Sequence, residues 1–130
     1  MKSVDQEGFE KAWKASEPYL QAALDKSGNE WTTDDVLKEV EDDHAIFYPV
    51  QNGAAIFRVA RYPQKRMLRI WIAGGHMAPN INAVLEAAEF HADQHDCDGI
   101  EIGGRKGWER VLKKHGYQHK SVLLVKNIGE

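Results

Sequence analysis

The sequence predicts an α/β (α+β) fold with a mixed, mostly antiparallel sheet, a central parallel strand pair and flanking helices. Three observations lead to this prediction. Apolar residues recur at helical spacing over the first 43 residues, and from residue 44 they alternate with polar residues around a hairpin turn. A second helical stretch then separates the last of these strands from a short apolar strand, which is the pattern of a right-handed crossover between parallel strands.

We expect one domain over residues 1–130, with a helical N-terminal part (1–43) and a sheet and helix core (44–130). No apolar run approaches bilayer length, and the N-terminus has no signal-peptide core. These features predict a cytoplasmic protein that does not partner a membrane. The lone Cys97 excludes an internal disulfide.

Charge is unevenly distributed along the chain. The net charge is −3, with an acidic excess over residues 1–53 and a basic excess over residues 99–130. The basic part either binds an anion or is a solvated helix face that attracts the acidic N-terminal part. The acidic total argues against a nucleic-acid partner, so we expect Trp108 to anchor the core rather than stack on a base.

The N-terminal part is predicted to contain three helices. The first covers about Ser3–Ala15, and the second covers Glu17–Lys26 because Ser16 and Pro18 resemble an N-cap and a first-turn proline. The third begins at a threonine cap, residue 32 or 33, and is followed by two aspartates in its first turn.

Three strands are predicted to form an antiparallel meander: Ala45–Val50, Ala54–Arg61 and Arg66–Ile72. The turns between them are Gln51–Gly53, a strong hairpin pattern, and Tyr62–Lys65. The remaining predicted elements are a helix over Asn80–His95, a strand over Gly99–Ile102 parallel to the third strand, a helix over Arg105–His115 and a last strand over Ser121–Val125.

This element order resembles the acyl-CoA N-acetyltransferase fold, called GNAT, with N-terminal helices in place of its usual first strand. The closing run GIEIGGRKGWERVLKKHGYQHKSVLLVK is similar to the end of that fold, where a helix stops at a Gly-Tyr pair, here Gly116 and Tyr117. Together with RYPQKRMLRIWIAGG and the helix ending at Asp96-Cys97, it also resembles small GNAT-like proteins of tailed phages and prophages.

The resemblance implies acetyl-CoA as cofactor and an amine as acceptor. In GNAT enzymes one strand splays from its parallel neighbour to admit the pantetheine arm, and the loop after it binds the pyrophosphate through backbone N–H groups. Carried over, the strand is Met67–Ile72 and the loop is Ala73–Asn80. The implied cofactor-binding residues are Ile70, Trp71, Ile72, Gly74, Gly75, His76, Asn80 and Arg105.

The loop and the acid position depart from the family pattern. The loop has adjacent glycines and no Arg or Lys, and Pro79 lacks an N–H donor. Counting back from Tyr117, Leu112 stands where active members often place a proton-donating tyrosine. Glu101 and His76 are the candidate general bases, although each is also an ordinary strand or loop residue.

A metal site is the less favoured interpretation of one histidine pair. His91 and His95 are four residues apart on one predicted helix, with Asp96 and Cys97 just beyond. The HExxH pattern fails because Ala92 replaces its glutamate. We therefore expect exposed helical histidines and no metal.

Two functions remain open at this stage. One is an acyl-CoA-dependent N-acetyltransferase with a degenerate cofactor loop. The other is a non-catalytic GNAT-fold phage protein that binds a phage structural protein, in the virion or the host cytoplasm. A V-shaped gap between Met67–Ile72 and Gly99–Ile102 would favour the first, whereas an exposed hydrophobic patch or an open sheet edge would favour the second.

Overall fold

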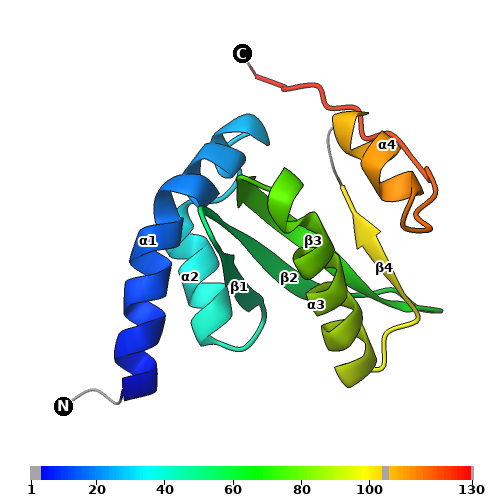
Figure 1. The fold of residues 1–130 in the computed structure, drawn as a ribbon. Coiled ribbons are helices and arrows are strands. Elements are labelled where there is room, and N and C mark those ends of the chain that lie inside the picture. The colour runs from blue at the N-terminus through cyan, green and yellow to red at the C-terminus, as the bar shows by residue number, and fades with distance from the viewer. Residues whose placement is uncertain (1–3, 104–105, 130) are drawn as a thin grey trace.

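The computed structural model describes residues 4–103 and 106–129. Helices flank a four-stranded sheet (Figure 1). In chain order the elements are α1 (Val4–Lys26), α2 (Thr33–Glu41), β1 (Ile46–Val50), β2 (Gly53–Arg61), β3 (Arg66–Gly75), the 3-10 turn η1 (Ala78–Asn80), α3 (Ile81–Gln94), β4 (Gly99–Ile102) and α4 (Lys106–Lys113).

The sheet has the predicted meander and crossover. Its strand order is β1-β2-β3-β4, with antiparallel pairs β1–β2 and β2–β3 and a parallel pair β3–β4. The turn between β2 and β3 is closed by two backbone hydrogen bonds between Tyr62 and Lys65. The mixed, mostly antiparallel sheet is therefore confirmed, but among the described strands the parallel pair lies at one edge rather than in the centre, because no described strand follows β4.

Each face of the sheet has its own hydrophobic core. The face covered by α3 and α4 is packed by Phe57, Leu68 and Ile70. The face covered by α1 and α2 is packed by Ile56 and Ile72. Two independent cores explain how so small a sheet buries both of its surfaces.

A β-bulge in β3 changes which face its side chains occupy. Ile70 pairs with Phe57 and Ile72 pairs with Ile56, so Trp71 has no partner on β2. Without this extra residue, Ile72 would share the face of Ile70. A bulge also bends its strand, and this bend lies where the contact between β3 and β4 ends.

The predicted break between the first two helices is wrong, because α1 is one helix that continues through Pro18. Ser16 is buried inside the helix and does not cap one. Proline costs a helix one hydrogen bond and some strain. Here Trp13, Leu20 and Leu24 form one buried stripe on both sides of the proline, and packing of that stripe on the sheet holds the helix together.

The cap of α2 agrees with prediction. Thr32 is the N-cap, and its side chain accepts a hydrogen bond from the Asp35 N–H while the Asp35 carboxylate accepts one from the Thr32 N–H. This capping box satisfies two N–H groups at the helix start. The hydrogen bonds from Thr32 hold the pKa of Asp35 below its usual value.

The predicted last strand is also wrong. Residues 118–129 form no strand, and Leu123 and Leu124 are 88% and 87% exposed. Four consecutive apolar residues do not alternate and so give no preferred face for pairing. In Figure 1 the segment runs back along α4, which ends at Lys113, and Gly116 beyond it has a left-handed φ of 89°. Among the described strands, β4 therefore has an open edge.

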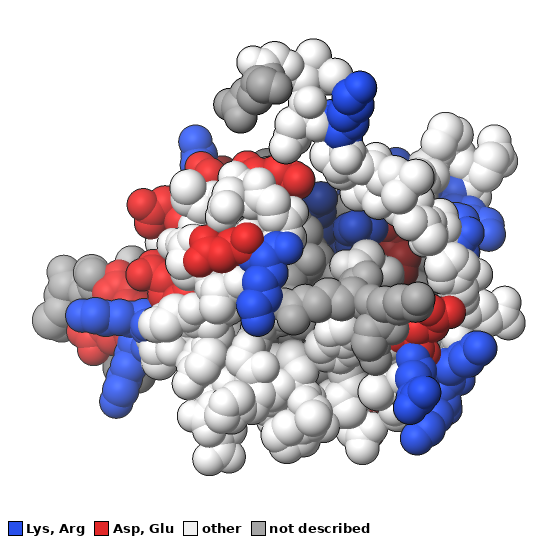
Figure 2. Space-filling model, turned by 90° about the horizontal axis from the view of Figure 1, so that it is seen from above, with Lys and Arg blue, Asp and Glu red and all other residues white. Residues whose placement is uncertain are grey.

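Charge follows the fold as the sequence indicates. Seen from above, most acidic side chains lie on one side of the molecule, where some Lys and Arg side chains also lie, and further Lys and Arg side chains lie at the opposite edge (Figure 2). In the described part of the chain, no helix is both long enough and apolar enough to span a bilayer.

Candidate functional site

Strand β4 ends partway along β3, and all four of its residues pair with that strand. The two strands pair only from Met67 with Gly99 to Ile70 with Ile102. Residues 72–75 of β3 pair with β2 on one side but have no described strand on the other. The bulge at Trp71 lies at this point, directly after the last residue of β3 that pairs with β4.

A cavity of about 140 Å³ lies at the C-terminal end of β3, beyond its pairing with β4. Helix α1 contributes one wall and Trp108 of α4 another, although α1 and α4 cover opposite faces of the sheet. A single cavity can contact both helices only where the sheet layer is open. Its lining residues are Tyr19, Ala22, Ala23, Lys26, Ala73, Gly74, Gly75, Met77 and Trp108.

Gly74 explains why α1 lies so close to the cavity. A Cβ atom at Gly74 would meet the backbone carbonyl of Tyr19 and would touch Ala23. The absence of a side chain therefore allows α1 to pack directly on β3. This packing also brings Lys26, the one basic residue of the lining, beside the glycines.

The predicted loop over Ala73–Asn80 is shorter in the structure, because β3 continues through Gly75, which pairs with Gly53. Gly75 has a φ of 92°, and a Cβ atom there would meet the carbonyl oxygen of Asn52. Glycine is required by both the left-handed conformation and the close approach.

Three N–H groups of the loop are already bonded within the protein. Those of His76, Met77 and Asn80 donate to backbone carbonyls at 2.9, 3.0 and 2.9 Å. The Asn80 side-chain amide also donates to the carbonyls of Gln51 and His76, at 3.0 and 2.7 Å. Since Pro79 has no N–H, this loop offers fewer donors to a pyrophosphate than the family pattern does.

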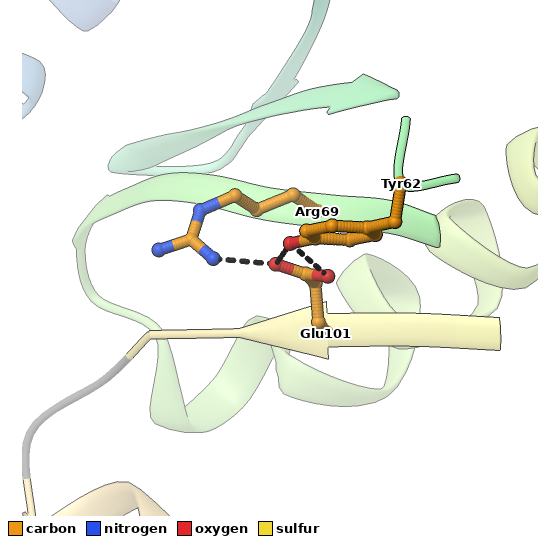
Figure 3. Close-up of polar contacts among 3 residues, drawn as sticks. All are labelled: Tyr62, Arg69 and Glu101. Atoms are coloured by element: carbon orange, nitrogen blue, oxygen red, sulfur yellow. Dashed lines mark hydrogen bonds and ion pairs between the residues drawn. The ribbon is translucent and has the colours of Figure 1, made fainter. Parts of the chain in front are cut away.

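A polar cluster lies beside the point where the pairing of β3 with β4 ends. Arg69 and Glu101 are register partners on β3 and β4, one residue before the last pair. Arg69 donates to Glu101 Oε2 at 2.6 Å, and the Tyr62 hydroxyl lies 2.9 Å from both carboxylate oxygens (Figure 3). The hydrogen bond to Glu101 raises the pKa of Tyr62. The carboxylate is thus fixed in place while it stays 22% exposed.

The two candidate bases are not brought together. His76 is exposed in the loop after β3, with its ring 6.5 Å from that of Tyr19. It lies seven residues beyond Arg69, the partner of Glu101, which is roughly 20 Å along a strand. Ile70 and Ile72 are buried in the two cores rather than in the cavity. Arg105 lies outside the described residues.

Sequence reasoning missed several residues of this region: Tyr62, Arg69, Lys26, Ala22 and Trp108 as a lining residue. Alternation along the strand places Arg69 on the face opposite Leu68 and Ile70, so the sequence pattern could have predicted the face that Arg69 occupies. The approach of Tyr62 to Glu101 and of α1 to β3 depends on long-range packing, which no local pattern encodes.

The position at which the family often places a proton donor, residue 112, is buried in the core. Leu112 is 5% exposed in the core under α3. Tyr117 packs against the same core, and its hydroxyl is buried without a hydrogen-bond partner among the described residues. Burial, with a smaller contribution from Glu89, raises the pKa of Tyr117 to about 12.

We expect Tyr117→Phe to make stability less sensitive to alkaline pH. A tyrosine with a normal pKa near 10 in the unfolded chain and about 12 in the folded one binds more protons when folded. Its stabilisation is therefore complete below pH 10 and is lost as pH rises toward 12. Urea denaturation from pH 8 to 11.5 should show a shallower decline in the variant, and identical declines would contradict this.

The histidine pair lies apart from the cavity lining. The ring of His91 lies 5.9 Å from Phe57 and 5.2 Å from Phe90, and burial followed by the neighbouring His95 lowers its pKa. Burial raises the pKa of the Cys97 thiol. Within the described ranges, no three His, Cys, Asp or Glu side chains are grouped as a metal site would need.

Comparison with solved structures identifies the fold. The chain superposes on a probable acetyltransferase with a TM-score of 0.69 at 9% identity, over 92% of this chain and 94% of that one. A protein of Thermus thermophilus matches with a TM-score of 0.62 at 14% identity, over 93% and 94% of the two chains. No family model and no curated protein matches the sequence.

A third solved structure names the chemistry of its own protein. Glucosamine-6-phosphate N-acetyltransferase from Arabidopsis thaliana matches with a TM-score of 0.57 at 12% identity, over 75% of this chain and 77% of that one. The protein therefore has the fold of the GNAT acetyltransferases, as its sequence resemblance implied. The expected likeness to phage proteins finds no support among these structures.

Proposed function

We propose that the protein is an acyl-CoA-dependent N-acetyltransferase with a reduced pyrophosphate loop. The observation that carries this proposal is the end of β4 at Ile102, which leaves residues 72–75 of β3 without a described strand on that side, with a cavity at this end of β3. The backbone groups of a strand inside a sheet form hydrogen bonds with a neighbouring strand on both sides. Among the described residues, no strand pairs with this side of residues 72–75 of β3, so these residues would pair with an extended ligand with amide groups, such as a pantetheine arm.

The residues of the cavity fit part of acetyl-CoA better than the rest. The narrow arm matches a cavity lined by small residues at Ala73 and Gly74 and bounded by Trp108. Lys26 would supply a positive charge to the phosphates, because the N–H groups of the loop are largely engaged. When bound, acetyl-CoA supplies the acetyl group as a thioester.

Glu101 is the proposed general base for the acceptor amine. It lies on β4, one residue before the last pair between β3 and β4 and so close to the end of β4. A carboxylate offers about four acceptor positions, and its two described partners leave room for an amine N–H. Arg69 and Tyr62 hold the carboxylate in one orientation, so it can take the amine proton without first reorganising.

Calorimetric titration with acetyl-CoA tests the proposal. We expect binding tighter than about 100 μM, roughly −5.5 kcal/mol. Ala22→Phe should weaken binding at least about tenfold, because Ala22 is exposed on α1 and its new side chain would enter the cavity. The matched control is Ala15→Phe, since Ala15 is also exposed on α1 but does not line the cavity.

Two outcomes would contradict the acetyltransferase proposal. The first is an absence of heat with the wild-type protein, together with no thermal shift at millimolar acetyl-CoA. The second is an equal loss of affinity in Ala22→Phe and Ala15→Phe, since that would show no role for the cavity.

The alternative is a non-catalytic protein that binds a partner, including a phage structural protein. The specific observation in its favour is the exposed apolar segment near the end of the chain, where Val122, Leu123, Leu124, Val125 and Ile128 are each at least 69% exposed. Exposed patches of this kind mark interaction surfaces. Under this alternative, Leu123→Asp would abolish partner binding, and acetyl-CoA would give no heat in the titration above.

A further inference from the structure

A row of charged side chains crosses three strands on one face of the sheet. Arg58 on β2 is the register partner of Arg69 on β3, and Arg69 is the partner of Glu101 on β4. Arg58 and Arg69 lie opposite the face of Phe57 and Leu68, so both belong to the face that α1 and α2 cover in part.

The two arginines of this row have different partners. Arg69 is paired with Glu101 at 2.6 Å. Within the described residues, Arg58 makes no ion pair or hydrogen bond, and the negative charges that act on it from a distance are those of Glu39 and Glu101. The Glu39 carboxylate is held by His44 at 2.9 Å instead.

Two tryptophan rings lie close to the Arg58 guanidinium. Its central carbon lies 4.2 Å from the ring centre of Trp71 and 5.8 Å from that of Trp31. A stacked guanidinium uses its flat face and keeps its N–H edge for a planar anion. Burial, and then the charge of Arg69, lowers the pKa of Arg58, so an anion placed here would relieve the repulsion between the two guanidinium groups.

We propose that Arg58 binds an anionic group, a carboxylate or a phosphate, on the amine that the protein acetylates. This inference rests on the proposed function, because Glu101 serves as the base for that amine. Arg58 and Glu101 are two strand spacings apart, about 10 Å between backbones. Both side chains lie on the same face of the sheet with Arg69 between them in the register, so an acceptor that contacts both carries its anion a few atoms from its amine.

Trp71 provides a direct readout of binding, because its ring lies against Arg58. We would titrate the protein with phosphoethanolamine and 4-aminobutyrate while recording tryptophan fluorescence. Ethanolamine and butylamine, which have the amine but no anion, are the matched ligands. We expect a saturable change only with the anionic amines, and phosphoethanolamine against 4-aminobutyrate distinguishes a phosphate from a carboxylate.

Variants separate an anion site from a structural arginine. Arg58→Gln should weaken binding of the anionic amines about ten- to hundredfold, since hydrogen bonds to charged groups are worth about 1.5–3 kcal/mol. Arg58→Lys should restore part of the affinity, because it keeps the charge but loses the two-point contact. Arg61→Gln is the control, since Arg61 is an exposed arginine at the end of the same strand.

Each result decides the inference. No saturable change with any of the four amines, equal binding of the neutral ones, or an equal loss in Arg61→Gln would overturn it. Acetyl-CoA is titrated in parallel with the wild-type protein and Arg58→Gln. If acetyl-CoA binds but the amines are not distinguished, this inference fails alone. If acetyl-CoA does not bind but the anionic amines do so through Arg58, the acetyltransferase proposal fails and the anion site stands.

Discussion

Glu101→Gln is expected to lower kcat for acetyl transfer about 10²- to 10⁴-fold, the usual contribution of a positioned general base. Glutamine keeps the size of the side chain and still accepts a hydrogen bond from Tyr62, but it cannot take a proton from the amine. Acetyl-CoA affinity should change little, because Glu101 does not line the cavity. Steady-state kinetics with an amine that the wild-type protein acetylates, together with calorimetry, would measure both effects.

Two comparisons make this experiment specific. Glu86→Gln alters an exposed carboxylate on α3 and should leave the rate unchanged. Arg69→Gln removes only a group that positions Glu101, so it should lower kcat by less than Glu101→Gln. A full rate in Glu101→Gln would assign the proton transfer to another group or to water.

Much of the fold could be predicted because local patterns and packing agree. The hairpin turn at Gln51–Gly53, the cap at Thr32 and the crossover to Gly99–Ile102 are each encoded by a short stretch of residues. At Pro18 they disagree. Local rules favour a helix start, but the buried stripe from Trp13 to Leu24 spans the proline and makes one helix.

The bulge at Trp71 was harder to predict from the sequence. Ile70, Trp71, Ile72 and Ala73 are consecutive apolar residues, and an apolar run does not show at which residue the alternation changes face. The bulge becomes determined only when two cores compete for the side chains of one strand. Since the bulge lies where the pairing of β3 with β4 ends, this detail of the candidate site was the hardest to predict.

The candidate site shows the same limit. Glu101 was accessible as a carboxylate on a short strand, but its contacts with Arg69 and Tyr62 join residues 32 and 39 positions away in the chain. His76 had the right chemistry for a base, yet the strand extends to Gly75 and carries it away from Glu101. Residue type suggested the candidates, and strand register distinguished them.

Leu20→Ala should lower the free energy of unfolding by about 2–5 kcal/mol, the range for a leucine that leaves a buried cavity. Leu20 is fully buried between α1 and the sheet. It lies beside Tyr19, which lines the candidate cofactor cavity and contacts Gly74 through its carbonyl. Urea denaturation followed by circular dichroism would measure the loss.

Gln21→Ala is the matched control on α1. Gln21 is exposed and donates to Asp25 one turn away at 2.9 Å, so its loss should cost no more than about 0.5 kcal/mol. A loss below about 1 kcal/mol in Leu20→Ala would mean that α1 is not held on β3 by this stripe. Because α1 carries Ala22, Ala23 and Lys26 of the cavity wall, a loosened helix should also weaken acetyl-CoA binding, so the same side chain links the stability of the fold to the proposed cofactor site.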